Sequence, residues 1–322
     1  MRAAQLVGPR QFEFVDVPPP TPKEGEALIR LEYLSVCGSD LRTYDRVLPE
    51  EQYPLEPGRP CHELLGVVEE SRSDLLNPGQ RVIAVTSVGG MVEHLAAPAE
   101  IMVPLPESAA KDPAPWVLCQ PLGTVIYSMQ QLGSVLGKRV VVLGQGPIGL
   151  TFTDLLARAG ATQVIAVDLH DYRLAKAKSM GATHTVNAAK DDVLEAVRDI
   201  TGGKLADVTI EATGRPETCH QLFSLLRLQG TAIAFGMSHD LDVFPFDWSA
   251  MYAKLPRLIV TNSAIAGERV ESVKTAVDLV DQGRLDISHM LTHRLPWKDV
   301  SRAFEIYSTK AEDSLKVVMS VS

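Results

Sequence analysis

Three glycines in the middle of the chain have the spacing of a dinucleotide-binding loop. Gly144, Gly146 and Gly149 follow an apolar, β-branched run and precede an apolar stretch of helical character. In such a loop the first glycine permits a tight turn, the second lets a pyrophosphate approach the backbone, and the third lets the helix pack on the strand. A helix opening at Pro147 and Ile148 would direct its free N–H groups toward the phosphates. The sequence therefore predicts a dinucleotide site.

An acidic residue at the end of the next apolar run bears on the choice of dinucleotide. Asp168 lies nineteen residues beyond Gly149 and ends the run 164–167. A carboxylate there can accept both hydroxyls of the adenosine ribose of NAD, and it repels the 2′-phosphate of NADP. Arg173 falls in the next predicted helix, where it either holds a 2′-phosphate or faces solvent. We expect NAD as the cofactor.

A second group of residues with metal-binding chemistry precedes the glycine loop. It consists of the motifs Cys37-Gly38-Ser39-Asp40, Cys61-His62-Glu63 and Cys119-Gln120-Pro121. Thiolate, imidazole and carboxylate groups are the usual protein ligands of zinc. The four cysteines form no Cys-x-x-Cys pair, and a single cysteine or histidine is more often a core or surface residue than a ligand. The three motifs therefore indicate a metal-binding site only when they are taken together.

These motifs are positioned by two kinds of predicted structure. Short strands are expected at 12–15, 27–31, 65–68 and 81–85, with turns at 23–26 and 77–80. Their spacing predicts a β-barrel-like domain, and residues 108–136 are predicted to form linking helices.

From residue 139 onward, strands and helices alternate. Strands are predicted at 139–143, 164–168, 183–187, 207–211, 231–235 and 258–261, and helices at 172–179, 216–228 and 268–282. This βαβ rhythm predicts a doubly wound parallel sheet. The final strand, 315–319, does not continue the rhythm and is expected to return to the first domain. The predicted α/β chain thus has a catalytic domain of residues 1–123 and 285–322 and a dinucleotide-binding domain of residues 124–284.

Composition narrows the class of protein. The chain has 322 residues, 45% hydrophobic and 22% charged, with a formal net charge of −9. Its length suits two domains. Its negative charge argues against a nucleic-acid partner or an anionic membrane surface. No apolar stretch reaches membrane-spanning length and the N-terminus lacks the apolar core of a signal peptide, so we expect a cytoplasmic protein with reduced cysteines.

In this order ahead of the glycine loop, the three motifs resemble those of the zinc-dependent medium-chain dehydrogenase/reductases, which include alcohol, sorbitol, threonine and glucose dehydrogenases. The resemblance covers nearly the whole chain and extends to Gly79-Gln80-Arg81-Val82 and Met180-Gly181-Ala182. It implies a GroES-like β-barrel catalytic domain joined to a Rossmann domain, NAD, and one catalytic zinc ion. It also implies a small-molecule alcohol or ketone substrate and a homo-oligomer, either a dimer or a tetramer.

The resemblance implies a ligand set and further catalytic roles. Cys37 and His62 would hold the zinc ion, with either Glu63 or Gln120 as third ligand. Asp40 would steady His62 through its other ring nitrogen. Ser39 would take the proton of the alcohol, a role compatible with its also capping a short helix at Asp40-Leu41-Arg42.

The chain departs from the family pattern in four places. Cys61 replaces the glycine before the histidine, Gln120 stands where a carboxylate is usual, and Arg42 occupies the position of a relay histidine. The cysteine-rich lobe for a second zinc ion is missing, so no structural zinc is expected. With Gln120 as ligand the site would keep one positive charge, whereas a glutamate would leave none. Cys61 and Cys119 stand beside the ligand positions as alternative thiolates.

The implied reaction is hydride transfer from a secondary alcohol, of polyol, sugar or cyclitol type, to NAD. One alternative is a zinc-free, NAD(P)H-dependent reductase of the same superfamily. The other is a non-catalytic dinucleotide-binding protein. The presence of Cys37, Ser39, His62 and Glu63 together favours the zinc enzyme.

Overall fold

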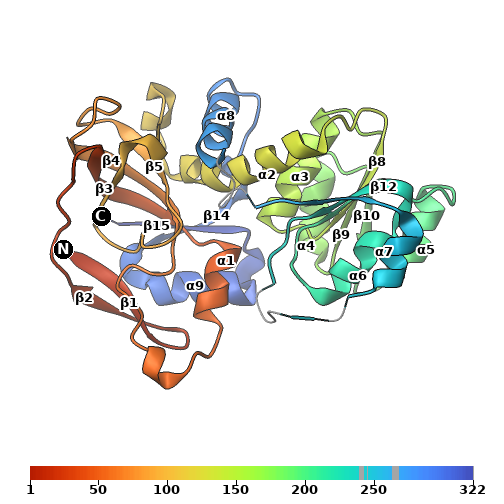
Figure 1. Cartoon of the computed structure of the whole chain (residues 1–322), viewed down its shortest axis with the longest axis horizontal. Coiled ribbons are helices and arrows are strands. Elements are labelled where there is room, and N and C mark those ends of the chain that lie inside the picture. The colour runs from red at the N-terminus through yellow and green to blue at the C-terminus, as the bar shows by residue number, and fades with distance from the viewer. Residues whose placement is uncertain (239–242, 245, 263–267, 322) are drawn as a thin grey trace. The chain divides into compact units, whose positions relative to one another are not determined.

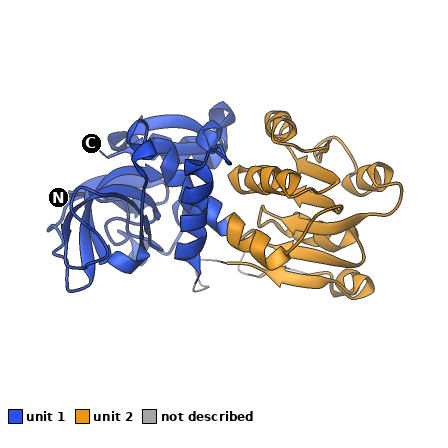
Figure 2. Cartoon of the chain, turned by 90° about the horizontal axis from the view of Figure 1, so that it is seen from above, with its two compact units in different colours: residues 1–124, 266–322 blue, residues 125–265 orange. Residues whose placement is uncertain are grey.

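The computed structural model describes residues 1–238, 243–244, 246–262 and 268–321. The chain divides into two compact units, one made of residues 1–124 and 266–322 and the other of residues 125–265 (Figure 2).

The first unit is built mainly of antiparallel strands. Strands β1 (Arg2–Gly8) and β2 (Gln11–Asp16) form a separate pair. The larger sheet has the order β14-β15-β3-β4-β5-β7, with β6 against β3. Its strands are β3 (Glu26–Ser35), β4 (Glu63–Ser71), β5 (Arg81–Val85), β6 (His94–Pro98), β7 (Met102–Pro104), β14 (Leu291–Pro296) and β15 (Lys316–Ser320). The last strand, β15, pairs antiparallel with β3, as expected from the sequence.

Alternation of side chains along β3 explains how this sheet forms a core. Ala27, Ile29 and Leu31 are fully buried, and they belong to the same hydrophobic cluster as Phe304 of helix α9 (Val300–Thr309). A half-buried antiparallel strand requires this period of two. Two residues, Val36 and Cys37, connect the end of β3 to the next short helix, α1 (Gly38–Tyr44).

Helix α8 (Arg269–Asp281) belongs to the first unit. The sequence-based boundary at residue 284 had placed it in the dinucleotide-binding domain. A Cβ atom added to Gly123 would lie 2.8 Å from Cγ2 of Val273, so α8 packs tightly on helix α2 (Cys119–Leu132). The alternation of strands and helices indicates that a helix follows a strand. It does not indicate which unit the helix packs against.

The second unit contains a six-stranded parallel sheet of order β10-β9-β8-β11-β12-β13 (Figure 1). Its strands are β8 (Arg139–Leu143), β9 (Gln163–Asp168), β10 (His184–Asn187), β11 (Ala206–Glu211), β12 (Leu226–Ala234) and β13 (Arg257–Val260). Its helices are α3 (Pro147–Arg158), α4 (Asp171–Ser179), α5 (Val193–Ile200), α6 (Pro216–Ser224) and α7 (Trp248–Lys254). In order of appearance this is the 3-2-1-4-5-6 arrangement of a Rossmann fold.

Both faces of the parallel sheet are covered by helices. Val142 of β8 clusters with Phe152 of α3, whereas its neighbour Val141 clusters with Val197 of α5. This explains why the strands are continuous apolar runs rather than alternating ones. The predicted strands are all present, but helix 216–228 was predicted too long. Helix α6 ends at Ser224 and β12 begins at Leu226, because the apolar residues there pair in the sheet instead of extending the helix.

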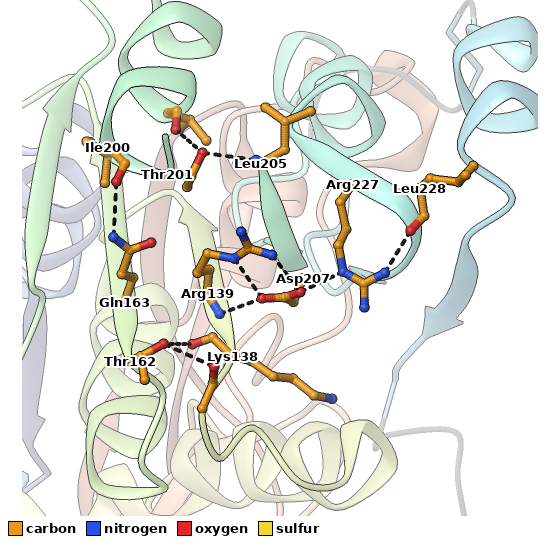
Figure 3. Close-up of polar contacts among 12 residues, drawn as sticks. Lys138, Arg139, Thr162, Gln163, Ile200, Thr201, Leu205, Asp207, Arg227 and Leu228 are labelled. Atoms are coloured by element: carbon orange, nitrogen blue, oxygen red, sulfur yellow. Dashed lines mark hydrogen bonds and ion pairs between the residues drawn. The ribbon is translucent and has the colours of Figure 1, made fainter. Parts of the chain in front are cut away.

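A charged cluster joins the amino ends of three strands (Figure 3). The carboxylate of Asp207 in β11 accepts hydrogen bonds of 2.9 Å from Nε and Nη2 of Arg139 in β8, and one of 2.6 Å from Nε of Arg227 in β12. The hydrogen bond from Arg139 is the largest of the effects that hold the pKa of Asp207 well below its usual range. The cluster lies at the edge of the sheet opposite the glycine loop, since Gly144 follows the carboxyl end of β8.

Candidate active site

Cys37, His62 and Glu63 come together in the first unit. Cys37 directly precedes α1, and Glu63 is the first residue of β4. One ligand atom from each lies within 4.8 Å of the others, and in the described part of the chain no second group of three His, Cys, Asp or Glu residues meets this criterion. A thiol, an imidazole and a carboxylate form a donor set typical of zinc, so these residues fit a zinc ion.

Asp40 orients both of the first two residues. Its Oδ1 lies 2.9 Å from Nδ1 of His62, and its Oδ2 accepts a 2.9 Å hydrogen bond from the backbone N–H of Cys37. The contact with His62 agrees with the sequence-based expectation, and it leaves the Nε2 lone pair of the ring available for a metal. Burial alone lowers the pKa of His62, but the charges and hydrogen bonds of Asp40 and Cys37 outweigh burial and raise it well above its ordinary value.

Ser39 lies within α1, one residue after its first residue. Its Oγ donates to Sγ of Cys37 at 3.3 Å. The expectation that Ser39 caps a helix starting at Asp40 is wrong, because α1 starts at Gly38 and its N-cap is Cys37. The hydroxyl is therefore hydrogen-bonded to the proposed ligand thiol of Cys37.

Glu63 has a partner that the sequence reasoning missed. Nζ of Lys316 lies 2.6 Å from Oε1 and 2.7 Å from Oε2 of Glu63, and it donates to the carbonyl oxygen of Val36 at 3.2 Å. Burial by itself lowers the pKa of Lys316, but the charge of Glu63 reverses this effect and raises the pKa above its usual range. The available signal was a lysine inside an otherwise apolar strand, β15.

The remaining cysteines near the motifs lie outside this group. Cys61 is fully buried and its Sγ donates to the carbonyl oxygen of Ser35 at 3.4 Å. Cys119 is fully buried, and burial raises its pKa. Their positions as alternative thiolate ligands therefore find no support in the geometry. Gln120 is buried in the first turn of α2, with 8% of its surface exposed.

The conformation of the glycine loop explains why glycine occupies its key positions. Gly144 has a φ of +90°, a conformation that a side chain would strain. A Cβ on Gly149 would lie 1.8 Å from the carbonyl oxygen of Gly144, so only glycine permits this approach of α3 to β8. A Cβ on Gly146 would meet nothing closer than Nη1 of Arg173 at 3.8 Å. The second glycine thus leaves space in front of Pro147 and Ile148, at the start of α3.

Asp168 is held beside this loop. Its Oδ2 accepts a 2.7 Å hydrogen bond from the backbone N–H of Gln145, and its Oδ1 accepts from the backbone N–H of His170 at 3.0 Å. Nδ1 of His170 lies 2.9 Å from the same oxygen. The side chain of Arg173 is only 11% exposed and its Nη1 lies 3.8 Å from Oδ2 of Asp168. Arg173 therefore turns toward the loop rather than to solvent.

Comparison with known proteins identifies the same two parts of the chain. The family model described as "Alcohol dehydrogenase GroES-like domain" matches residues 23–107, and the one described as "Zinc-binding dehydrogenase" matches residues 147–282. An L-threonine 3-dehydrogenase of Bacillus velezensis is 26% identical over 330 residues, with 90% of each chain covered. An alcohol dehydrogenase of Cupriavidus necator is 26% identical over 370 residues, covering 99% of this chain and 98% of its own.

Solved structures share the fold over the full length. The alcohol dehydrogenase of Thermus sp. ATN1 superimposes with a TM-score of 0.87 at 24% identity, with 100% of both chains covered. The L-idonate 5-dehydrogenase of Escherichia coli gives a TM-score of 0.81 at 22% identity, covering 99% of this chain and 97% of its own. Within the described ranges, no helix is both long and apolar enough to cross a bilayer.

Proposed function

We propose that this chain, which belongs to the medium-chain dehydrogenase/reductase superfamily of zinc-type alcohol dehydrogenases, transfers a hydride from a secondary alcohol to NAD with the help of one catalytic zinc ion. The observation that carries the proposal is the convergence of Cys37, His62 and Glu63. An intact glycine loop with Asp168 beside it supports the cofactor part. The superfamily resemblance supports a substrate of polyol, sugar or cyclitol type.

The residues around the site have distinct roles in this proposal. Cys37 and His62 hold the metal, and Asp40 fixes the ring of His62 through a 2.9 Å contact with Nδ1. Zinc held there would supply Lewis-acid chemistry that lowers the pKa of the alcohol hydroxyl. Ser39, whose Oγ is 3.3 Å from Sγ of Cys37, accepts the proton of the alcohol. Arg42 cannot pass that proton on at neutral pH, so ribose hydroxyls or water complete the path.

The third metal ligand is either Glu63 or Gln120. Glu63 belongs to the group of converging donors, yet both of its oxygens already accept hydrogen bonds from Lys316. A carboxylate oxygen has lone pairs for two partners, so pairing with Lys316 weakens Glu63 as a ligand without excluding it. Gln120 provides a neutral carbonyl oxygen in the alternative ligand set.

NAD rather than NADP is proposed as the cofactor. The dinucleotide supplies the hydride acceptor, and the protein supplies its orientation. In this proposal the carboxylate of Asp168, the last residue of β9, accepts a ribose hydroxyl and repels a 2′-phosphate. We place the reaction in the cytoplasm, because the four cysteines are free thiols. We also propose that the chain forms a dimer or tetramer, as part of the same resemblance.

The test is NADH formation from a panel of polyols and other secondary alcohols, run on metal-free protein with and without added zinc. We expect that at least one alcohol is turned over and that this turnover requires added zinc. Turnover of an activated double bond or carbonyl by the metal-free protein would instead favour the zinc-free reductase. Tight binding of NAD without turnover of any substrate would favour a non-catalytic protein.

A further inference from the structure

The carboxylate of Asp168 already has partners in the protein on both of its oxygens. Each of its oxygens already accepts a backbone hydrogen bond, from Gln145 to Oδ2 and from His170 to Oδ1. Oδ1 also contacts Nδ1 of His170 at 2.9 Å, while the side chain of Asp168 is only 6% exposed. The imidazole of His170 is 38% exposed, so it is the partner that solvent protons and a bound nucleotide can both reach.

A second cation accompanies this pair. Nη1 of Arg173 lies 3.8 Å from Oδ2 of Asp168, and Nε of Arg173 donates to the hydroxyl of Tyr172 at 2.9 Å. The ring of Tyr172 packs against His170 with centroids 5.7 Å apart. His170 is thus faced by Asp168 and Tyr172, with Arg173 on the far side of the carboxylate.

The next charged residue along the chain does not compete for His170. Oδ1 of Asp171 accepts a hydrogen bond from Asn187, and its Oδ2 pairs with Lys190 at 2.6 Å. Three groups that can carry charge, Asp168, His170 and Arg173, therefore meet at the proposed ribose-binding position. With a neutral His170 the sum of Asp168, His170 and Arg173 is zero, and with a protonated His170 it is one positive charge.

We propose that His170 determines how strictly this site selects NAD over NADP. In its neutral form His170 leaves the three groups without net positive charge, so the carboxylate of Asp168 still disfavours a 2′-phosphate. In its protonated form it neutralises Asp168 and, together with Arg173, favours the phosphate, so the site accepts NADP at low pH. The inference rests on the proposed function and deepens it, because it assigns a specificity-determining role at the same cofactor site.

Binding of the oxidised cofactors tests this directly. Isothermal titration calorimetry on the full chain gives the ratio of Kd for NADP to Kd for NAD at pH 8.5 and at pH 6.0, a range that spans imidazole titration. For the wild type we expect the ratio to fall by about tenfold on acidification, on the scale of removing one like-charge repulsion near the protein surface. The 2′-phosphate itself gains a proton in this range, so part of the fall does not depend on His170.

Three variants isolate the contribution of the histidine. His170→Asn should retain only the small change due to the phosphate, and His170→Arg should show the lower ratio at both pH values. His184→Asn is the matched control, since His184 lies in the neighbouring strand β10 and contacts Thr183 instead of Asp168. It should keep the wild-type response. His170 is also the N-cap residue of α4, and a purely structural role would alter the melting temperature in His170→Asn without altering its pH response.

A His170→Asn ratio that falls with pH as much as the wild-type ratio would overturn the inference, as would a wild-type ratio that does not change. Either result leaves the proposed NAD site in place. If neither cofactor bound at either pH, the proposed function would fail and the inference would fail with it.

Discussion

Nζ of Lys316 lies 2.6 Å from Oε1 of Glu63, and the two residues are 2% and 0% exposed to solvent. The same ammonium group donates to the carbonyl oxygen of Val36. Lys316 therefore connects the residue before Cys37 with the residue after His62. Strand β15 thus contributes, through Lys316, to holding the proposed metal site together.

Removing this lysine should destabilise the protein strongly. Lys316→Met leaves the buried Glu63 unpaired, which costs about 3–5 kcal/mol in comparable cases. The double variant Lys316→Met with Glu63→Gln should recover part of the loss, because no buried charge then lacks a partner. The free energy of unfolding in urea measures both effects. Lys190→Met is the control, since the Lys190–Asp171 pair is exposed and should matter little; an equal loss in that control would contradict the account.

The charged cluster at the amino ends of the strands predicts a pH dependence of stability. The pKa of Asp207 in the folded protein is depressed, chiefly by Arg139. The ionised carboxylate therefore contributes to folding stability at neutral pH, and this contribution is lost as the pH falls through the folded-state pKa. Asp207→Asn should lower the free energy of unfolding by about 1–3 kcal/mol at pH 7.

The difference in the free energy of unfolding between wild type and Asp207→Asn should stay constant from about pH 8 to 5. It should shrink below about pH 4, where the carboxyl group of Asp207 in the unfolded chain begins to take up protons. Urea unfolding at a series of pH values measures it. A difference in free energy that grows on acidification would show that the pKa of Asp207 is shifted in the opposite direction.

The carboxyl ends of the parallel strands were easier to predict than the metal site. Gly144, Gly149 and Asp168 follow apolar runs whose strand character is local, so their positions in space follow from sequence order. Lys316 lies 253 residues from Glu63 in the chain. No local pattern indicates such a pairing, because it depends on β15 returning to pair with β3.

The same reasoning explains the other differences. By its contacts, helix α8 groups with the first unit, whereas the sequence-based boundary places it in the dinucleotide-binding domain, because a helix pattern does not identify its packing partner. Cys61 looked like an alternative ligand because it precedes His62. Cys61, however, is fully buried in the core cluster of the first unit, whereas the neighbouring His62 is only partly buried.

Cofactor preference should depend on Asp168. Asp168→Asn keeps the size of the side chain but loses the charge, so NAD affinity should fall by about tenfold or more and discrimination against NADP should narrow. Part of the fall will come from the glycine loop, since Asp168 also accepts the backbone N–H of Gln145. Steady-state kcat/KM with NAD and with NADP measures the preference at pH 8. Wild-type turnover with NADP as fast as with NAD would remove the role assigned to Asp168.

The neutral side chain of Gln120 makes a prediction about the metal. If Gln120 is a ligand, Gln120→Glu adds one negative charge to the site, so zinc should be held more tightly. A less positive site lowers the pKa of the alcohol less, and the alkaline limb of turnover should move to higher pH. Metal content and a pH–rate profile measure the two effects. Unchanged zinc affinity and an unchanged profile would favour Glu63 as third ligand.

Cys37→Ser should behave differently from Gln120→Glu, losing both zinc and most of the activity. Cys219→Ser is the control, because Cys219 lies in α6 of the other unit and should leave both properties unchanged. Zinc content and turnover of the two cysteine variants, measured side by side, decide whether the thiolate of Cys37 is needed. Full zinc content and activity in Cys37→Ser would remove this residue from the ligand set.

The most direct test of the central claim is a zinc titration of the metal-free protein, followed by the rate of NADH formation from an alcohol that the panel identifies. We predict that turnover rises in proportion to bound zinc and saturates at one ion per chain, since the described residues offer a single group of converging ligands. Turnover that is already complete in the metal-free protein would contradict the zinc mechanism, and a requirement for two ions would contradict the absence of a second site.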